Sequence, residues 1–222
     1  MKFLTMTATL LAAVFATTAA SAHTDKPHPA GAAKGPATQS VAAPDAKGGT
    51  RDPQAYFTDL ELQTQDGRKV RFYSDMLQGR TVLLNVIYTN CGDACPLITQ
   101  QLNDVRNRLP EQFGKQVHFI TISSDPKRDS PAAMKQFAQK QGADVAGWTW
   151  LTGSKANLDQ ILKKLGMYSE QVEGHSTQLI AGNVAAKRWS KIRPDAPPAA
   201  IAERLSTLAG DAGTAEVPMA RP

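Results

Sequence analysis

Cys91 and Cys95 are the residues whose type and spacing most directly indicate chemistry in this chain of 222 residues. They follow an apolar, β-branched run at residues 81–88 and precede Pro96. Pro96 suits the start of a helix, because its missing N–H needs no partner there. The positive end of a helix lowers the pKa of a nearby thiol and favours the thiolate, which attacks disulfides and binds soft metals.

Three roles are open for this pair of cysteines. A structural disulfide would close a loop so short that the chain-entropy model assigns it only about 2 kcal/mol. A dithiol catalyst usually has a Cys-x-x-Cys spacing, which is one residue tighter. A metal site is the third role: two thiolates suit Cu(I), and an added imidazole makes a three-coordinate set that also accepts Cu(II).

The chain has four histidines that could supply such an imidazole. His23 and His28 lie in a polar N-terminal stretch, and His118 lies in an apolar strand pattern, where we expect a core residue. His175 lies in a polar loop at residues 173–176, just before a late strand pattern. It is therefore the candidate third ligand.

Hydrophobic periodicity predicts strands that alternate with helices. Residues 81–88 and 117–123 read as buried strands with a helical pattern between them, which predicts parallel strands joined by a right-handed crossover. Asp66-Gly67 marks the turn of an opening hairpin. The whole pattern predicts an α/β domain with a mixed sheet flanked by helices. The predicted strands are 60–64, 69–72, 81–88, 117–123, 148–151, 178–181 and 185–190, and the predicted helices are 96–109, 130–141, 154–165 and 198–208.

Composition restricts the class of protein further. Hydrophobic residues make up 41% and charged residues 20% of the chain, which allows a buried core and excludes a wholly disordered polymer. A polytopic membrane protein is excluded because only one apolar segment approaches the length needed to span a membrane. Lys and Arg number 25 against 20 Asp and Glu, and they are scattered. Without a basic run, nucleic acid is not an expected partner.

The N-terminal segment is predicted to direct export. Residues 1–22 combine Lys2, an apolar run and Ala20-Ser21-Ala22, a small-x-small cleavage site, and are predicted to be a cleavable signal peptide. Residues 23–52 are predicted to be a disordered leader, 53–208 the folded domain and 209–222 a disordered tail. We therefore expect a periplasmic protein with no firm membrane span. The alternative is an uncleaved N-terminal membrane anchor.

Three motifs, in order along the chain, resemble those of one known family. Residues 89–96 read TNCGDACP, residues 124–131 read SDPKRDSP, and His175 lies between Gly174 and Ser176. These are similar to the T-x-C-P-D-x-C-P, D-P-x-R-D-T-P and D-H-S motifs of the Sco/SenC family. Its members are exported copper-binding proteins that help to assemble the copper centres of respiratory cytochrome oxidases. The resemblance covers residues 57–208.

The resemblance implies a thioredoxin-like fold with an N-terminal β-hairpin, and copper ligands at Cys91, Cys95 and His175. It also implies that Asp93 shapes the cysteine loop and that Asp125 is structural. The implied partners are a copper-receiving protein, such as a cytochrome oxidase subunit, and a thiol reductant protein.

Two residues depart from the family motifs. Gly92 replaces the usual proline, which removes a fixed φ from the cysteine loop. Gly174 replaces the usual aspartate before the histidine, which removes a carboxylate that could act on the metal ligands.

Two functions are consistent with these observations. The first is a periplasmic metallochaperone that binds copper and delivers it to a respiratory oxidase or to another copper protein. The alternative is a thiol–disulfide oxidoreductase in which Cys91 and Cys95 form the redox-active pair and keep copper-site cysteines reduced. A general thioredoxin is disfavoured, because that class places a cis-proline opposite its cysteines and no proline occurs between Leu151 and Arg193. A thiol peroxidase would need an arginine in the Cys91 loop, which has none.

Overall fold

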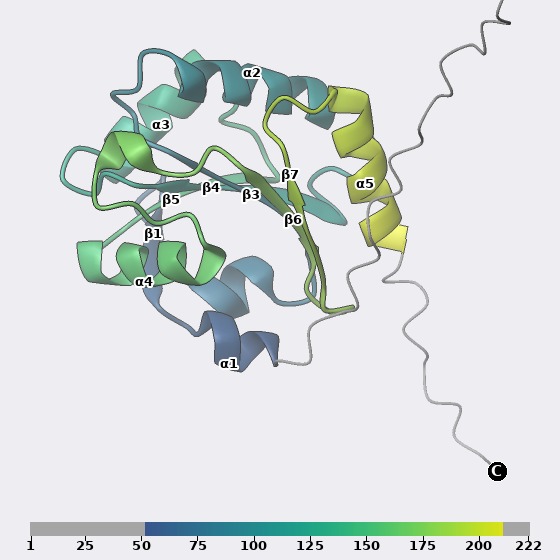
Figure 1. The fold of residues 1–222 in the computed structure, drawn as a ribbon, viewed down its shortest axis with the longest axis horizontal. Helices are drawn as coiled ribbons and strands as arrows, with labels where there is room; N and C mark the ends of the chain where they lie inside the picture. The colour runs from purple at the N-terminus through teal and green to yellow at the C-terminus, as the bar shows by residue number, and fades with distance from the viewer. Residues whose placement is uncertain (1–51, 211–222) are drawn as a thin grey trace, which may run out of the picture. The chain divides into compact units, whose positions relative to one another are not determined.

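The computed structural model describes residues 52–210, whose strands form one seven-stranded sheet in the order β2-β1-β5-β4-β3-β6-β7 (Figure 1). Strand β3, which has a neighbour on each side, is buried at every residue, which explains its near-continuous apolar sequence. The strands are β1 (Glu61–Thr64), β2 (Lys69–Arg71), β3 (Thr81–Ile87), β4 (Val117–Ser123), β5 (Trp148–Thr152), β6 (Leu179–Asn183) and β7 (Arg188–Ile192). The helices are α1 (Pro53–Phe57), the π-helical turn η1 (Phe72–Leu77), α2 (Ala94–Asn107), α3 (Pro131–Lys140), α4 (Lys155–Leu165), the 3-10 turn η2 (Val172–Gly174) and α5 (Pro198–Gly210).

The sheet is mixed, as the sequence pattern predicted. Strands β3, β4 and β5 are parallel, with Thr81 opposite Val117 in the first pair. Strand β1 pairs antiparallel with β5 and with β2, so the predicted N-terminal hairpin forms one edge of the sheet. Strands β6 and β7 add the other edge, also antiparallel.

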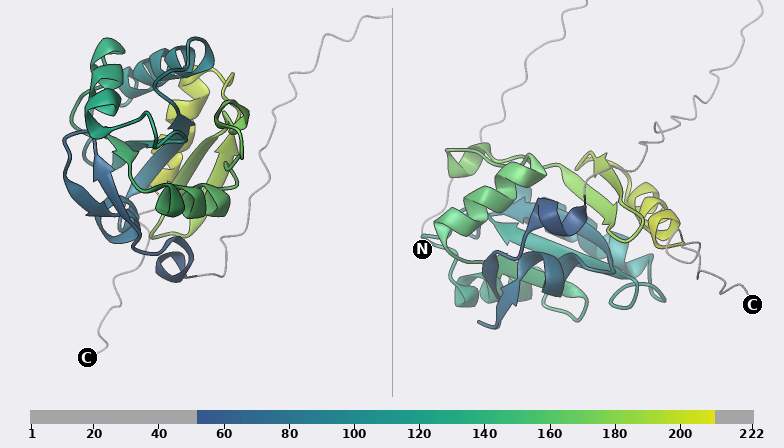
Figure 2. Two further views of the ribbon diagram at one scale, coloured as in Figure 1. Left: turned by 90° about the vertical axis from the view of Figure 1, so that its left-hand side faces the viewer. Right: turned by 90° about the horizontal axis from the view of Figure 1, so that it is seen from below.

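Helices cover both faces of the sheet. Figure 1 shows α2, α3 and α5 over one face and α1 and α4 over the other, and the right-hand view of Figure 2 looks onto the second face. Along β3, Leu83 and Ile87 pack into the core on the side of α2, α3 and α5. Val82, Leu84 and Val86 pack into the core on the side of α1 and α4. This alternation is the period of two that a strand buried on both faces requires.

The start of α2 differs from the prediction. The helix begins at Ala94, two residues before Pro96. A proline is tolerated there because the first four N–H groups of a helix have no intrahelical partner. The earlier start places Cys95 inside the first turn, and Cys91 in the loop that leads into it.

The late hairpin also differs from the prediction, which placed its turn at Gly182-Asn183. Both residues belong to β6, and the turn follows them. Gly182 lies opposite Trp189, and a Cβ on Gly182 would lie only 2.2 Å from a ring carbon of that tryptophan. The glycine therefore makes room for an aromatic ring in the sheet, which a turn-forming interpretation of the sequence could not reveal.

Several predictions concern residues that the structure does not describe. The predicted signal peptide (1–22), residues 23–51 of the predicted leader and residues 211–222 of the predicted tail lie outside the described range. Helix α5 continues to Gly210, past the predicted helix end at Leu208. Within residues 52–210, no helix has the length and apolar character needed to cross a membrane.

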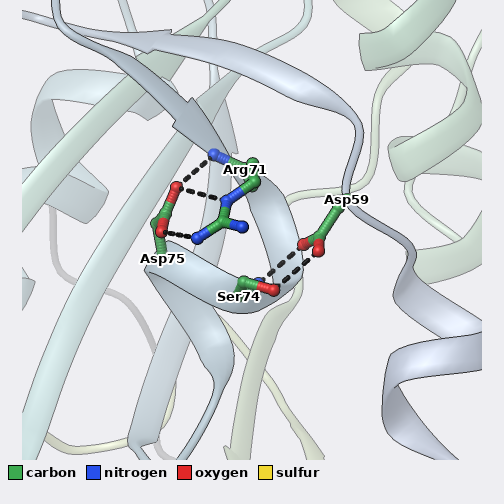
Figure 3. Close-up of polar contacts among 4 residues, drawn as sticks. All are labelled: Asp59, Arg71, Ser74 and Asp75. Atoms are coloured by element: carbon green, nitrogen blue, oxygen red, sulfur yellow. Dashed lines mark hydrogen bonds and ion pairs between the residues drawn. The ribbon is translucent and has the colours of Figure 1, made fainter.

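Two carboxylates hold the π-helical turn that joins the hairpin to β3 (Figure 3). Asp75 accepts hydrogen bonds from the backbone N–H of Arg71 at 2.7 Å and from its guanidinium at 2.9 and 3.2 Å. Asp59 accepts from the N–H and hydroxyl of Ser74 at 2.8 and 2.6 Å. Hydrogen bonds from Arg71 lower the pKa of Asp75 from 3.8 to about 2, and those from Ser74 lower the pKa of Asp59.

These contacts predict a pH dependence of stability. Because pairing lowers the pKa of Asp75 in the folded chain, its stabilisation is complete above its ordinary pKa of 3.8 and is lost as the pH falls through about 2. The free energy of unfolding of an Asp75→Asn variant should therefore lie furthest below that of the unchanged protein at neutral pH, and the two should converge in strong acid. Urea unfolding across this pH range measures the difference. Asp104→Asn, at an exposed position of α2, is the control, and a constant difference at every pH would contradict the prediction.

Candidate metal centre

A buried carboxylate fixes the loop that carries the cysteines. Asp129 is 1% exposed, and one of its oxygens accepts hydrogen bonds from the N–H and hydroxyl of Thr89 at 3.0 and 2.6 Å. Its other oxygen accepts from the hydroxyl of Ser123 at 2.6 Å. Thr89 comes two residues after the end of β3, and Ser123 ends β4. The loop thus starts from a point tied to both parallel strands, at the sheet edge where α/β proteins bind ligands.

The two cysteines meet across the start of α2. Both are free thiols, Cys91 half-buried and Cys95 buried. The backbone N–H of Cys95 donates to the sulfur of Cys91 at 3.3 Å. Asp93 stands at the N-cap position, but its side chain makes no capping hydrogen bond. The Cys91 sulfur therefore accepts one of the free N–H donors of the first helical turn.

The two thiols differ in how readily they ionise. Burial tends to raise the pKa of Cys91, but hydrogen bonds from Cys95, the backbone N–H of Asp93 and Tyr88 outweigh it and lower that pKa. Deeper burial, together with the neighbouring Cys91, raises the pKa of Cys95 to about 12. Cys91 is consequently the thiol that is both reachable and inclined to form a thiolate.

His175 lies directly after η2 and is only 8% exposed. Its Nδ1 lies 3.1 Å from the carbonyl oxygen of Ser176, so in the tautomer with the proton on Nδ1 the other nitrogen, Nε2, is left to accept a metal. Burial lowers the pKa of the ring, although the Ser176 carbonyl acts against it. A neutral ring is the form that coordinates metal ions.

Tyr88 contacts both the histidine and the first cysteine. Its ring lies edge-on to the ring of His175, with centroids 5.7 Å apart. Its pKa is raised to about 12, mainly by burial and then by its hydrogen bond with Cys91. The sequence pattern placed Tyr88 within the predicted strand 81–88, whereas β3 ends at Ile87 and Tyr88 lies just beyond it.

The structure brings only part of the predicted ligand set together. Cys91 and Cys95 lie next to each other, and Tyr88 contacts both His175 and Cys91. In the part of the chain described, however, no three Cys, His, Asp or Glu side chains lie close enough together to hold one ion. A shared site would require the segment around η2 and the cysteine loop to approach each other, so the three-ligand set stays a prediction. His118 lies at the opposite end of β4, where its Nε2 is 3.3 Å from the Lys115 carbonyl oxygen.

The two departures from the family motifs differ in their surroundings. A Cβ on Gly92 would meet nothing within 4 Å, so packing does not demand glycine there. A Cβ on Gly174 would lie 2.7 Å from the hydroxyl oxygen of Ser169. An aspartate at position 174 would therefore require Ser169, whose hydroxyl also accepts from the N–H of Gln171, to move.

A family model, known proteins and solved structures match this chain. The SCO1/SenC family model matches residues 48–209. The SCO1 protein homolog of Bacillus subtilis is 32% identical over 116 residues, which cover 51% of this chain and 58% of that protein, so the chain spans about three fifths of this relative. The solved structure of BsSco, a member of the Sco family of cytochrome c oxidase assembly proteins, has a TM-score of 0.59 at 25% identity and covers 69% of this chain and 93% of that one.

A second solved structure supports the fold alone. The copper-bound ScoI of Bradyrhizobium japonicum has a TM-score of 0.56 at 24% identity, and the match covers 67% of this chain and 96% of that one. Together these structures confirm the predicted thioredoxin-like class, with its mixed sheet, flanking helices and opening hairpin.

The asymmetry of the thiols predicts selective alkylation. When the reduced protein is treated with limiting iodoacetamide at neutral pH, Cys91 should be modified well before Cys95, because it is more exposed and forms thiolate more readily. Peptide mapping by mass spectrometry measures the two sites separately. In urea the two thiols should react at similar rates, and faster labelling of Cys95 in the folded protein would contradict the structure.

The loop anchor predicts a loss of stability. An Asp129→Ala substitution leaves the donors of Thr89 and Ser123 without their acceptor, which should lower the free energy of unfolding by about 2 kcal/mol. Urea unfolding measures this change. Asp104→Ala, which removes a carboxylate from an exposed position of α2, should change stability little. An unchanged unfolding midpoint for Asp129→Ala would show that the loop does not depend on this carboxylate.

Proposed function

Because this chain belongs to the SCO1/SenC family, we propose that it is a periplasmic copper metallochaperone that binds its cargo through Cys91, Cys95 and His175. The observation that carries the proposal is the thiol pair at the carboxyl end of β3, with one sulfur accessible at the start of α2. The copper would pass to an oxidase copper centre or to another periplasmic copper protein. The relative BsSco belongs to a family of cytochrome c oxidase assembly proteins, which supports the oxidase as the recipient.

The donor set suits copper in both of its common oxidation states. Two thiolates are soft donors that suffice for Cu(I), and a neutral imidazole adds the harder nitrogen that Cu(II) prefers. The bond between Nδ1 and the Ser176 carbonyl would fix the His175 ring so that Nε2 faces the cargo. Three ligands leave one coordination position open. A ligand of the recipient protein could bind the copper there before the copper dissociates from this chain.

The surface beside the thiols would receive the partner. A groove of about 380 Å³ next to Cys91 is lined in part by Pro96, Phe137 and Lys140. Leu97, in the first turn of α2, is 67% exposed, and within residues 52–210 no other large hydrophobic side chain is exposed. An apolar side chain and a groove beside the reactive sulfur would let a copper-receiving protein dock close enough for ligand exchange.

The periplasm would add a redox condition to binding. In an oxidising compartment the pair can close to a disulfide, which binds no metal. The chain would therefore need a thiol reductant protein before each loading. Export would depend on residues 1–22 acting as a signal peptide, or as an anchor if they are not cleaved.

One observation favours a second function, that of a thiol–disulfide oxidoreductase. Cys91 is accessible and Cys95 is buried beside it, which is the arrangement of an attacking and a resolving thiol. The Cys91 thiolate would attack a substrate disulfide, forming a mixed disulfide and releasing one substrate thiolate. Cys95 would then displace the second, leaving a Cys91–Cys95 disulfide for an external reductant to reopen. Catalytic reduction of a protein disulfide by the copper-free protein would support this function.

The metallochaperone proposal predicts that His175→Ala affects the two oxidation states unequally. Affinity for Cu(II) should fall by about a hundredfold or more, because a ligand is lost, while Cu(I) should stay bound by the two thiolates. Anaerobic titration of the reduced protein against competing chelators measures both affinities, and thiolate-to-Cu(II) absorption reports the site.

His118→Ala is the matched control, since it removes an imidazole at the other end of β4 and should change neither affinity. Unchanged Cu(II) affinity in His175→Ala would remove this residue from the site. Loss of the charge-transfer band in Cys91→Ser would still be expected.

A further inference from the structure

A groove of about 410 Å³ lies on the opposite face of the sheet from the thiol pair. Its lining residues come from α1, the end of α4, strand β6, the edge strand β7 and the turn between these two strands. The right-hand view of Figure 2 presents the face of the sheet that α1 and α4 cover. Its volume falls in the range of pockets that hold small organic ligands. Its apolar lining is formed mainly by Tyr56, Phe57, Leu165, Ile180 and Trp189.

The floor of the groove is aromatic and rigidly placed. The ring of Trp189 packs against Phe57, with centroids 5.1 Å apart, and occupies the space above Gly182. Because any larger residue than glycine would displace this ring, the backbone of β6 is adapted to hold it. Trp189 is nevertheless only half-buried, so one part of its ring remains available to a ligand.

The rim of the groove is positively charged. Its charged lining residues are Lys164, Lys187 and Lys191, with no acidic residue among them. The Lys164 ammonium donates to the carbonyl oxygen of Tyr56 and so ties α4 to α1. Within residues 52–210, neither Lys187 nor Lys191 forms an ion pair, which leaves two ammonium groups at the mouth of an apolar groove.

The backbone at Lys187 is also unusual. Its φ is +55°, in the left-handed region that favours glycine or asparagine, at the end of the β6–β7 turn. Glycine would fit this position without strain, yet the chain carries a lysine beside the groove. Residues held in such conformations often serve a site.

We propose that this groove binds a small anionic amphiphile, namely a carboxylate or similar acid on a short apolar chain or ring. The apolar body would lie on Trp189 and Phe57, and the acid group would meet Lys187 and Lys191. The rim charge selects this class over a neutral apolar ligand. Residues 23–51 are a poor occupant on chemical grounds, since they contain two acidic against four basic residues and no aromatic residue.

The tryptophans provide a direct test. The indole N–H of Trp148 donates to Thr121 at 2.8 Å and that of Trp150 to the Ala143 carbonyl at 3.2 Å, both in the core, so only Trp189 should sense the groove. The ¹⁵N-labelled full chain is titrated with sodium octanoate below its micelle concentration, and then with the neutral analogue 1-octanol. We expect a saturable shift of the Trp189 indole signal alone, at lower concentration for octanoate than for octanol.

Substitution of the rim separates charge from apolar contact. A Lys187→Gln, Lys191→Gln double variant should bind octanoate about fivefold more weakly, the order expected for loss of two exposed charge pairs, and octanol unchanged. A Lys69→Gln, Lys127→Gln double variant, which removes the same number of charges at exposed positions of β2 and of the loop before α3, should leave both affinities unaltered. If the Trp189 indole signal does not shift during the octanoate titration, the proposal is overturned. Equal octanoate binding by the rim double variant and the unchanged chain would also overturn it, as would a joint movement of all three indole signals, which would indicate loosening of the fold.

Discussion

The position of the thiol pair depends on one buried carboxylate. Asp129 comes from the segment between β4 and α3, yet it accepts hydrogen bonds from Thr89, two residues after the end of β3, and from Ser123, at the end of β4. A charge with 1% exposure is tolerated only because these donors satisfy it. Since the cysteine loop starts at Thr89, this contact transfers the rigidity of the parallel sheet to the residues that do the chemistry.

From that fixed start, the first turn of α2 makes two chemically similar residues unequal. Cys91 precedes the helix and receives an N–H donor from it, whereas Cys95 faces the core. For this reason the pKa of the Cys91 thiol is lowered and that of the Cys95 thiol is raised. The Cys91 sulfur is therefore suited to react with a partner, while the Cys95 sulfur stays in the core. A metallochaperone and a dithiol reductant both need such a division, which explains why the same geometry is compatible with either chemistry.

The two faces of the sheet have different surfaces. The thiol pair lies on the side of α2 and α3, where Cys91 lines a groove. The other face carries the aromatic groove with its lysine rim, where α1 and α4 meet the edge hairpin. Near the histidine, a Cβ on Gly174 would lie 2.7 Å from the hydroxyl oxygen of Ser169, so a larger residue at position 174 would require that side chain to shift.

The sequence by itself determined the class of fold, the thiol pair and its place between a buried strand and a helix. These depend on periodicity and on near neighbours in the chain, and the three motifs identified the family. Only the tertiary structure decided that Asp129 holds Thr89, that Tyr88 connects His175 to Cys91, and that Gly182 lies beneath Trp189 instead of in a turn. Each of these contacts joins side chains across different strands or loops. A pattern of hydrophobic residues specifies which face of an element is buried, but not which distant side chain will meet it there.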